Sequence, residues 1–192
     1  MLSEENIRRI QKYYPFLVPR NVFTDDIVVG EKPYLLGFVD GWERLFLLFC
    51  KNLRPHLIEG KILESFRFHQ IKEKYGRMEI YNSGYPGSVY DTGLDRIYTY
   101  LGTRICSRCG EPVKYVTHGY IEYVCKKCGR FLKKKIGTRI SRVSRRMKIK
   151  TTIATAAGIY HKKYNLRPYY KEYMQCKKMS EDEFVEYLLK EC

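Results

Sequence analysis

The sequence predicts an α+β fold in three parts: a small helix and β-hairpin domain over residues 1–104, a four-cysteine zinc ribbon over 105–130, and a basic, mainly helical region over 131–192 that ends in an acidic helix. Three observations support this division. Apolar residues of the first part recur at helical and strand spacings, and two CxxCG motifs follow. A stretch of forty-nine residues from Tyr123 to Lys171, here called the basic tract, contains no Asp or Glu.

Two helices are predicted at the start of the first part. Ser3 is a typical N-cap, apolar residues follow it at helical spacing, and Pro15 limits the first helix. The second helix, from about Gly41 to Leu53, is apolar over more than half of its circumference, so we expect it to be the central core helix.

A β-hairpin and a third helix are expected next. Residues 66–72 alternate in strand fashion, residues 74–76 turn the chain, and residues 77–81 return it. After a loop rich in Gly, residues 89–103 carry apolar side chains at helical spacing and lead into the first cysteine motif.

Four cysteines give the most specific chemical signal. Cys106 and Cys109 form one CxxCG knuckle, and Cys125 and Cys128 form a second one after fifteen residues, which is the spacing of a zinc ribbon. In each knuckle a tight turn aims two thiolates at one ion, and the Gly that follows allows a positive φ. Four thiolates suit Zn²⁺ and leave no open coordination position, so we expect structural Zn²⁺ as the cofactor. Iron–sulfur ligation and a pair of disulfides remain alternatives.

The segment between the knuckles supports the ribbon. Residues 114–117 and 120–124 are predicted to form two short strands around a turn at His118 and Gly119. We therefore expect His118 to be an exposed turn residue and not a metal ligand.

The other three cysteines have no partner at a motif spacing. They are Cys50, which we expect in the core, Cys176 and Cys192. An odd total of seven cysteines and no signal peptide predict a reducing, cytoplasmic location, and no apolar run has the length of a membrane span.

The basic tract holds essentially all of the excess charge. It contains sixteen of the thirty-six Lys and Arg residues, while the rest of the chain has twenty basic against twenty-one acidic residues. A local cationic surface beside a metal-pinned module predicts a polyanionic partner, DNA or RNA. The expected phosphate contacts are Lys126, Lys127, Arg130, Lys133, Lys134, Lys135, Arg139, Arg142, Arg145, Arg146, Lys148, Lys150, Lys162, Lys163 and Arg167.

The region 131–192 is predicted to be mainly helical. Residues 133–150 are expected to be extended or helical, and residues 151–166 to form a helix or a pair of helices. Ala154 and Gly158 have the spacing of a helix-turn-helix, but Pro168 would break its recognition helix, so this signal is weak.

The last element is an acidic helix. Ser180 and Glu183 form a capping box, and apolar residues follow at helical spacing. We expect this helix to fold back on the core or on the basic segment.

Enzymatic activity is not expected. The sequence contains no GxxxxGK[ST] motif, no nucleophile signature and no recognised nuclease motif. Glu79, Asp91 and Asp95 could form a divalent-metal site, but surface solubilisation explains these carboxylates as well. His69 could act as a base beside Lys72, but a solvated, mixed-charge end of the hairpin is the preferred explanation.

Part of the chain also resembles a known domain. The order of helix, hairpin, helix and CxxC resembles an uncharacterised domain that recurs in phage and bacterial proteins. The matching residues are Gly41-Trp42, Gln70 to Gly76 with Tyr81, and Cys106 to Pro112. The domain's usual hairpin is close to QIKEKFGxLRFY, from which this chain departs at Met78, Glu79 and Ile80. The resemblance covers about residues 40–130 and implies a phage or mobile-element origin, but that family has no established activity to transfer.

The sequence thus predicts a non-enzymatic zinc-ribbon protein that contacts the phosphate backbone of nucleic acid through residues 126–171. The alternative is a phage-type inhibitor or modulator that binds a host nucleic-acid-handling complex, such as a polymerase or a CRISPR effector. A metal-dependent nuclease is the least favoured hypothesis.

Overall fold

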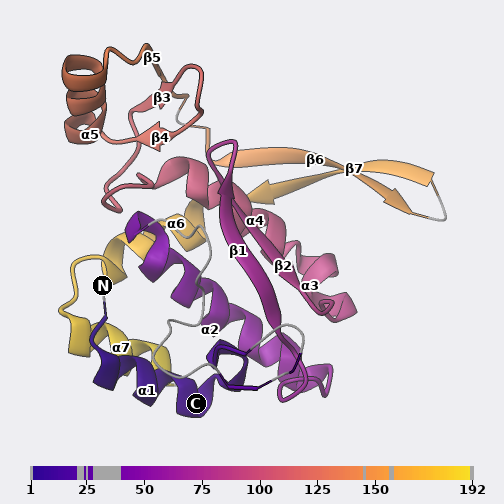
Figure 1. Ribbon diagram of the computed structural model, residues 1–192. Coiled ribbons are helices and arrows are strands. Elements are labelled where there is room, and N and C mark those ends of the chain that lie inside the picture. The colour runs from indigo at the N-terminus through magenta and orange to yellow at the C-terminus, as the bar shows by residue number, and fades with distance from the viewer. Residues whose placement is uncertain are drawn as a thin grey trace.

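The computed structural model in Figure 1 describes residues 2–20, 24, 26–27, 40–144, 146–155 and 158–190, without the side chains of residues 153–155 and 160. It shows a body of helices around α2 (Glu43–Glu59), a small cysteine-containing module at one end, and a long β-hairpin that projects from the body. Arg145 and Cys192 lie outside the described residues. Within these ranges, no helix has both the length and the apolar character needed to cross a membrane.

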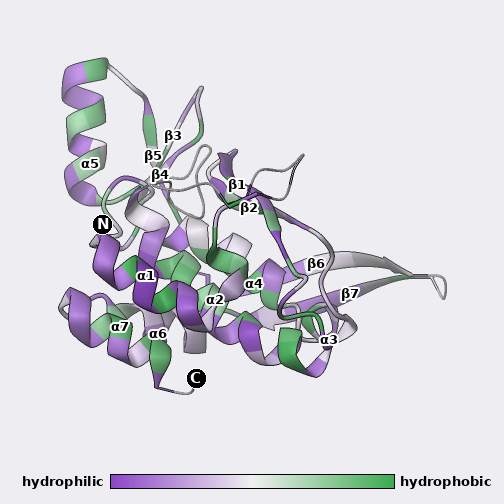
Figure 2. Ribbon diagram, turned by 60° about the horizontal axis from the view of Figure 1, so that its bottom comes forward, coloured by the Kyte–Doolittle hydropathy of each residue, from purple (hydrophilic) through white to green (hydrophobic). Residues whose placement is uncertain are grey.

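The core surrounds α2, as its apolar circumference predicts. Its residues Leu45 to Cys50 are almost fully buried, and α3, α4, α6 and α7 all contact it. Figure 2 shows green, hydrophobic residues on the helices gathered around α2. The helix runs six residues beyond the predicted end at Leu53 and contains Pro55 near its C-terminus.

Elements from both ends of the chain complete this core. They are α1 (Glu4–Tyr13), the 3₁₀ turn at Pro15–Leu17, α6 (Arg167–Cys176) and α7 (Glu181–Leu189). The predicted caps are confirmed: the Asn6 amide donates to Ser3 Oγ at 3.4 Å, and Ser180 and Glu183 form a capping box. The final helix folds back on the core, where the Tyr14 hydroxyl donates to the Leu188 carbonyl at 2.7 Å.

The first predicted hairpin is also confirmed. Antiparallel strands β1 (Phe68–Lys74) and β2 (Arg77–Asn82) are joined by Tyr75 and Gly76, which both have positive φ, as a tight hairpin turn requires. Ile71 and Met78 are buried, so one face of the hairpin belongs to the core.

The helix predicted over residues 89–103 is divided. The structure has α3 (Gly87–Thr92), α4 (Leu94–Leu101) and a 3₁₀ turn (Gly102–Arg104). Gly93 has φ +69°, and a Cβ atom there would lie 2.0 Å from the Tyr164 ring. The break therefore makes room for a residue that is distant in sequence.

Residues 105–142 form the cysteine module. Strands β3 (Tyr115–Thr117) and β4 (Tyr123–Val124) form the expected hairpin, and β5 (Ile140–Arg142) adds to the other edge of β3. Between β4 and β5, α5 (Lys126–Phe131) continues into a π-helical turn (Leu132–Ile136).

The prediction of helices over residues 151–166 is wrong, and with it the helix-turn-helix. This segment forms an antiparallel hairpin of β6 (Lys148–Thr155) and β7 (Gly158–Asn165), and the predicted residues Ala156 and Ala157 lie outside the described ones. The small residues around Ala154 and Gly158 suggested a helix turn. The flanking Ile and Thr residues instead favour a strand, and the burial of Thr151 and Tyr164 on one face fixes it there.

Candidate metal centre and basic surface

The two knuckles have different local structures. In the first, Gly110 has φ +71°, and its amide donates to the Cys106 carbonyl at 2.9 Å. In the second, Cys125 is the N-cap of α5, and its thiol accepts a hydrogen bond from the Cys128 amide at 3.4 Å. The positive φ expected after the second CxxC is wrong, because Gly129 is helical; its lack of a side chain instead allows close packing against the ring of Tyr115.

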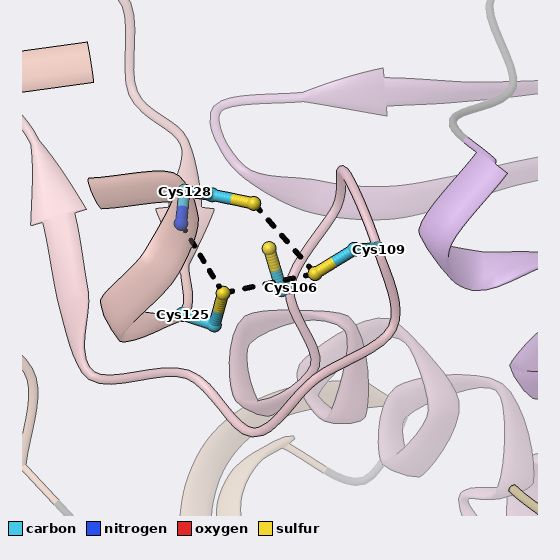
Figure 3. Close-up of side chains that lie close together, drawn as sticks. All are labelled: Cys106, Cys109, Cys125 and Cys128. Carbon is cyan, nitrogen blue, oxygen red and sulfur yellow. Dashed lines mark hydrogen bonds between the residues drawn. The ribbon is translucent and has the colours of Figure 1, made fainter. Parts of the chain in front are cut away.

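Four sulfur atoms meet between the knuckles. All four Sγ atoms lie within 4.8 Å of one another, and Cys109 Sγ is 3.6 Å from the Sγ atoms of both Cys125 and Cys128. Figure 3 shows the four thiols pointing toward one another from the two knuckles. A tetrahedral ion with metal–sulfur bonds of about 2.3 Å requires sulfur atoms about 3.8 Å apart. The group could therefore hold one metal ion.

The thiol pKa values show why such a group favours a cation. Burial raises the pKa of Cys106 to about 11. Burial and the charge of Cys106 raise the pKa of Cys128 well above its usual value. At Cys125 burial acts in the same direction, but hydrogen bonds from the Cys128 amide and the neighbouring thiols outweigh it and lower the pKa. Four thiolates packed this closely repel one another, and a central cation would stabilise them.

The first knuckle is fixed directly to the core. A Cβ atom on Gly41 would lie 2.2 Å from the Cys106 carbonyl oxygen, so only glycine allows this approach. The Trp42 indole donates to the Ile105 carbonyl at 3.0 Å, and the Tyr173 hydroxyl of α6 donates to the Gly110 carbonyl at 2.9 Å. The four-cysteine group is thus continuous with the folded body.

The turn of the β1–β2 hairpin braces the other side of the module. Gly76 lies against Tyr123, whose ring would be 2.5 Å from a Cβ atom at that position. The Tyr120 hydroxyl donates a short hydrogen bond to Glu73, and this bond raises the pKa of Tyr120. Gly41-Trp42, the β1–β2 turn and the first CxxC, which carry the sequence resemblance, therefore meet at one interface.

The predicted phosphate contacts divide into two exposed groups. The larger group lies on the cysteine module: Lys126, Lys127 and Arg130 on α5, Lys133, Lys134 and Lys135 on the π-helical turn, Arg139 before β5 and Arg142 within it. The other group is associated with the β6–β7 hairpin: Lys148, Lys150, Lys162 and Lys163 on its strands, with Arg146 before β6 and Arg167 at the start of α6. All of these are exposed except Lys162, which is half-buried.

A hollow on the module gathers part of the first group. His118, Lys133, Arg139, Ile140 and Ser141 line a cavity of about 340 Å³. The His118 ring and the Ser141 hydroxyl are 2.6 Å apart and hydrogen-bonded. His118 is an exposed residue beside the β3–β4 turn, as predicted, and it lies outside the cysteine group.

The carboxylates considered for a nuclease do not form a metal-binding group. In the described part of the chain, the side chains that could hold an ion together are the four cysteines. Asp91 is exposed, whereas Asp95 is half-buried with its pKa raised by burial, and it pairs with Arg96 at 3.4 Å.

Sequence reasoning missed the residues that position the centre. Tyr173 contacts the knuckle from a helix 63 positions away, and Lys177 of the same region forms an ion pair with Glu111. No local pattern marks these residues. Gly41 was visible as part of the Gly41-Trp42 motif, but its contact with Cys106 was not.

Comparison with known proteins finds no matching family model, no similar curated protein and no similar solved structure. The resemblance of residues 40–130 to a phage and bacterial domain therefore rests on the motif residues alone.

Proposed function

We propose that this chain is a non-enzymatic nucleic-acid-binding protein whose cysteine module is held by structural Zn²⁺. The proposal rests on the exposure of the cations in the basic tract and on their lack of acidic partners. They are almost all exposed, and among the described residues none of them forms an ion pair. A surface of this kind suits a repeating polyanion because each phosphate bound releases condensed counterions.

Zn²⁺ is the preferred ion for chemical reasons. Four thiolates around one centre form a closed tetrahedral site, which is typical of structural zinc. The sulfur atoms are too close for an iron–sulfur cubane, in which each cysteine binds a different iron, and too far apart for disulfide bonds. A single iron would have the same geometry, so metal analysis of the purified protein decides between the two ions.

The module supplies a rigid cationic platform for phosphates. Cys125, one of the four cysteines, is the N-cap of α5, so a bound ion would fix the helix that carries Lys126, Lys127 and Arg130. The hollow beside Lys133 and Arg139 could accept a phosphate group. If about six to eight phosphates are neutralised, affinity should fall by about three orders of magnitude or more between 50 and 200 mM salt.

The proposal is tested by binding of the zinc-loaded protein to single- and double-stranded DNA and RNA across a salt series. The module variant changes Lys126, Lys127, Lys133 and Arg139 to Gln. It should weaken binding to every polymer and reduce the salt slope by about 3 to 4. A control changes four exposed lysines elsewhere, Lys12, Lys61, Lys178 and Lys190, to Gln and removes the same charge. Equal effects from both variants, or no binding by the wild type, would contradict the proposal.

A second candidate function is inhibition or modulation of a host nucleic-acid-handling complex. The exposure of two apolar side chains on the cationic helix supports it: Phe131 is 53% exposed and Ile136 is 62% exposed. Such residues could dock on an acidic protein surface, and Phe131 could equally stack on a base. Tight binding to one host complex, with weak and salt-labile binding to oligonucleotides, would favour this candidate over the first.

A further inference from the structure

The β6–β7 hairpin projects from the body as an arm, and the contacts that its described residues make with the body lie at its base (Figure 1). The ring of Tyr164 is buried against Gly93, and the Leu166 amide donates to the Met147 carbonyl at 2.8 Å. Lys162 donates to the Asp91 carbonyl in the same region. These contacts set the direction of the arm and leave its outer part beyond the body.

The strand register gathers the cations on one face. Lys150 lies directly opposite Lys163, and Lys148 opposite Asn165. The next pair on this face is Thr152 and His161, which are hydrogen-bonded at 3.1 Å. Two facing lysines destabilise a hairpin, and no acidic residue in the basic tract compensates them. The charge on this face is therefore suited to a bound anion.

The outer part of the arm is chemically different from its base. Residues 153–160 are Ile-Ala-Thr-Ala-Ala-Gly-Ile-Tyr and carry no charge. Ile159 near the tip is 73% exposed. The sequence of the arm is thus cationic toward its base and uncharged from residue 153 to residue 160.

These dimensions fit one groove. Two paired strands lie about 4.8 Å apart, and eight residues extend about 25 Å. The major groove of B-DNA is about 12 Å wide and admits a two-stranded ribbon. The major groove of an RNA duplex is too deep and narrow for side chains to read.

We infer that the β6–β7 arm enters the major groove of duplex DNA. Lys148, Lys150 and Lys163 contact phosphates along the groove edge, while the outer part of the same face, which includes the exposed Ile159, meets the base edges. This inference rests on the proposed nucleic-acid-binding function and names duplex DNA as its target.

The test separates shape from charge by shortening the arm without changing its charge. Residues 153–160 are replaced by Asn-Gly, a two-residue turn that joins Thr152 to His161 and preserves the cationic face. A second variant keeps the full arm and changes Lys148, Lys150 and Lys163 to Gln. Both variants should retain the wild-type metal content and a cooperative thermal transition, which verifies folding, and the lysine variant should melt no lower than the wild type because it removes the repulsion between Lys150 and Lys163.

Binding is measured with the zinc-loaded proteins on a DNA duplex, on its single strands and on an RNA duplex of the same sequence. Shortening should weaken duplex DNA binding at least about tenfold with an unchanged salt slope, and should leave single-strand binding as it was. The lysine variant should reduce the duplex salt slope by about 2 to 3.

Three results would overturn the inference. If the shortened arm binds duplex DNA like the wild type, while the module variant is weakened, the arm has no role in the groove and the proposed function stands. If shortening weakens all polymers equally, the arm is a general contact and not a groove element. If the wild type binds no nucleic acid at physiological salt, the proposed function fails, and the inference fails with it.

Discussion

The hairpins β1–β2 and β6–β7 have similar lengths, but the first packs on the rest of the protein and the second extends away from it. β1–β2 places its turn against the cysteine module, with Gly76 beside Tyr123, whereas the strands of β6–β7 extend away from the body. Each hairpin has one pair of facing cations, Lys74 with Arg77 in the first and Lys150 with Lys163 in the second. The first hairpin differs in that it also pairs Lys72 with Glu79.

The charged side chains of the two hairpins also have different environments. In β1–β2 the charged side chains have partners in the protein, since Lys72 lies over the Tyr81 ring and Arg77 over the Tyr100 ring. Most of the cations of β6–β7 face solvent. The first hairpin therefore supports the four-cysteine group, whereas the second exposes most of its cations to solvent.

Loss of the proposed Zn²⁺ should have the largest effect, and it should affect the two hairpins differently. Structural Zn²⁺ contributes about 10–16 kcal/mol in small zinc domains, so replacing Cys106 and Cys109 by Ser should unfold the cysteine module. Hydrogen exchange should then accelerate at the β1–β2 turn, which loses its support, and remain unchanged in β6–β7. Cys50→Ala is the control: it removes a buried thiol outside the metal group and should keep one ion per chain. Equal exchange changes in both hairpins would contradict the division of roles.

Two glycine substitutions should loosen one hairpin each. Gly93→Ala combines a left-handed backbone with a clash against the buried Tyr164 ring, so we expect a loss of about 2–4 kcal/mol in unfolding free energy and weaker protection of β7. Gly76→Ala meets the half-buried Tyr123 ring, which has more room to move, and should cost about 1–3 kcal/mol.

Chemical denaturation with residue-resolved hydrogen exchange measures both effects. Gly87→Ala is the matched control, because this residue has an ordinary φ and no atom within 4 Å of a new Cβ. A loss at Gly87 as large as that at Gly93 would show that the contact with Tyr164 is not responsible.

A charge reversal should sharpen the contrast between the hairpins. Lys163→Glu places opposite charges across the arm and should stabilise it by about 0.2–1 kcal/mol. The same change should weaken DNA binding, because it puts a negative charge on the proposed binding face. Lys72→Glu in the first hairpin should instead destabilise, since it faces Glu79. Thermal melting and the salt-series binding assay measure the two effects, and a Lys163→Glu variant that melts earlier would contradict the argument.

The smallest effect concerns a contact remote from both hairpins. Hydrogen bonds from the Asn6 side chain and from Ser3 lower the pKa of Glu181 to about 2. Because the folded pKa is depressed, the stabilisation is present above about pH 4.5 and is lost as the pH falls toward 2. Wild type and Glu181→Gln should differ by a few tenths of a kcal/mol at pH 6, the usual size for an exposed contact, and converge near pH 2. A difference that grows on acidification would show the opposite sign.

The predictions from sequence were correct where the residues that determine an element lie close together in the chain. Ser3 and Ser180 mark helix starts, Tyr75-Gly76 marks a turn, and the cysteine spacing brings four sulfurs together. It failed for the β6–β7 arm because Ala154 to Gly158 resembles a helix turn, whereas the strand depends on packing of Tyr164 at Gly93. The contacts that fix the metal centre to the body likewise join residues far apart in the chain.

The bonds between α1 and α7 join residues 175 and 176 positions apart. During synthesis, both hairpins and all four cysteines are therefore made before α7 can cover the apolar surface of α2. Contacts of such long sequence separation form slowly and leave hydrophobic surface exposed in the meantime. Chaperone capture of the growing chain should consequently concentrate on α2, and it should end only when Phe184, Val185 and Leu188 dock.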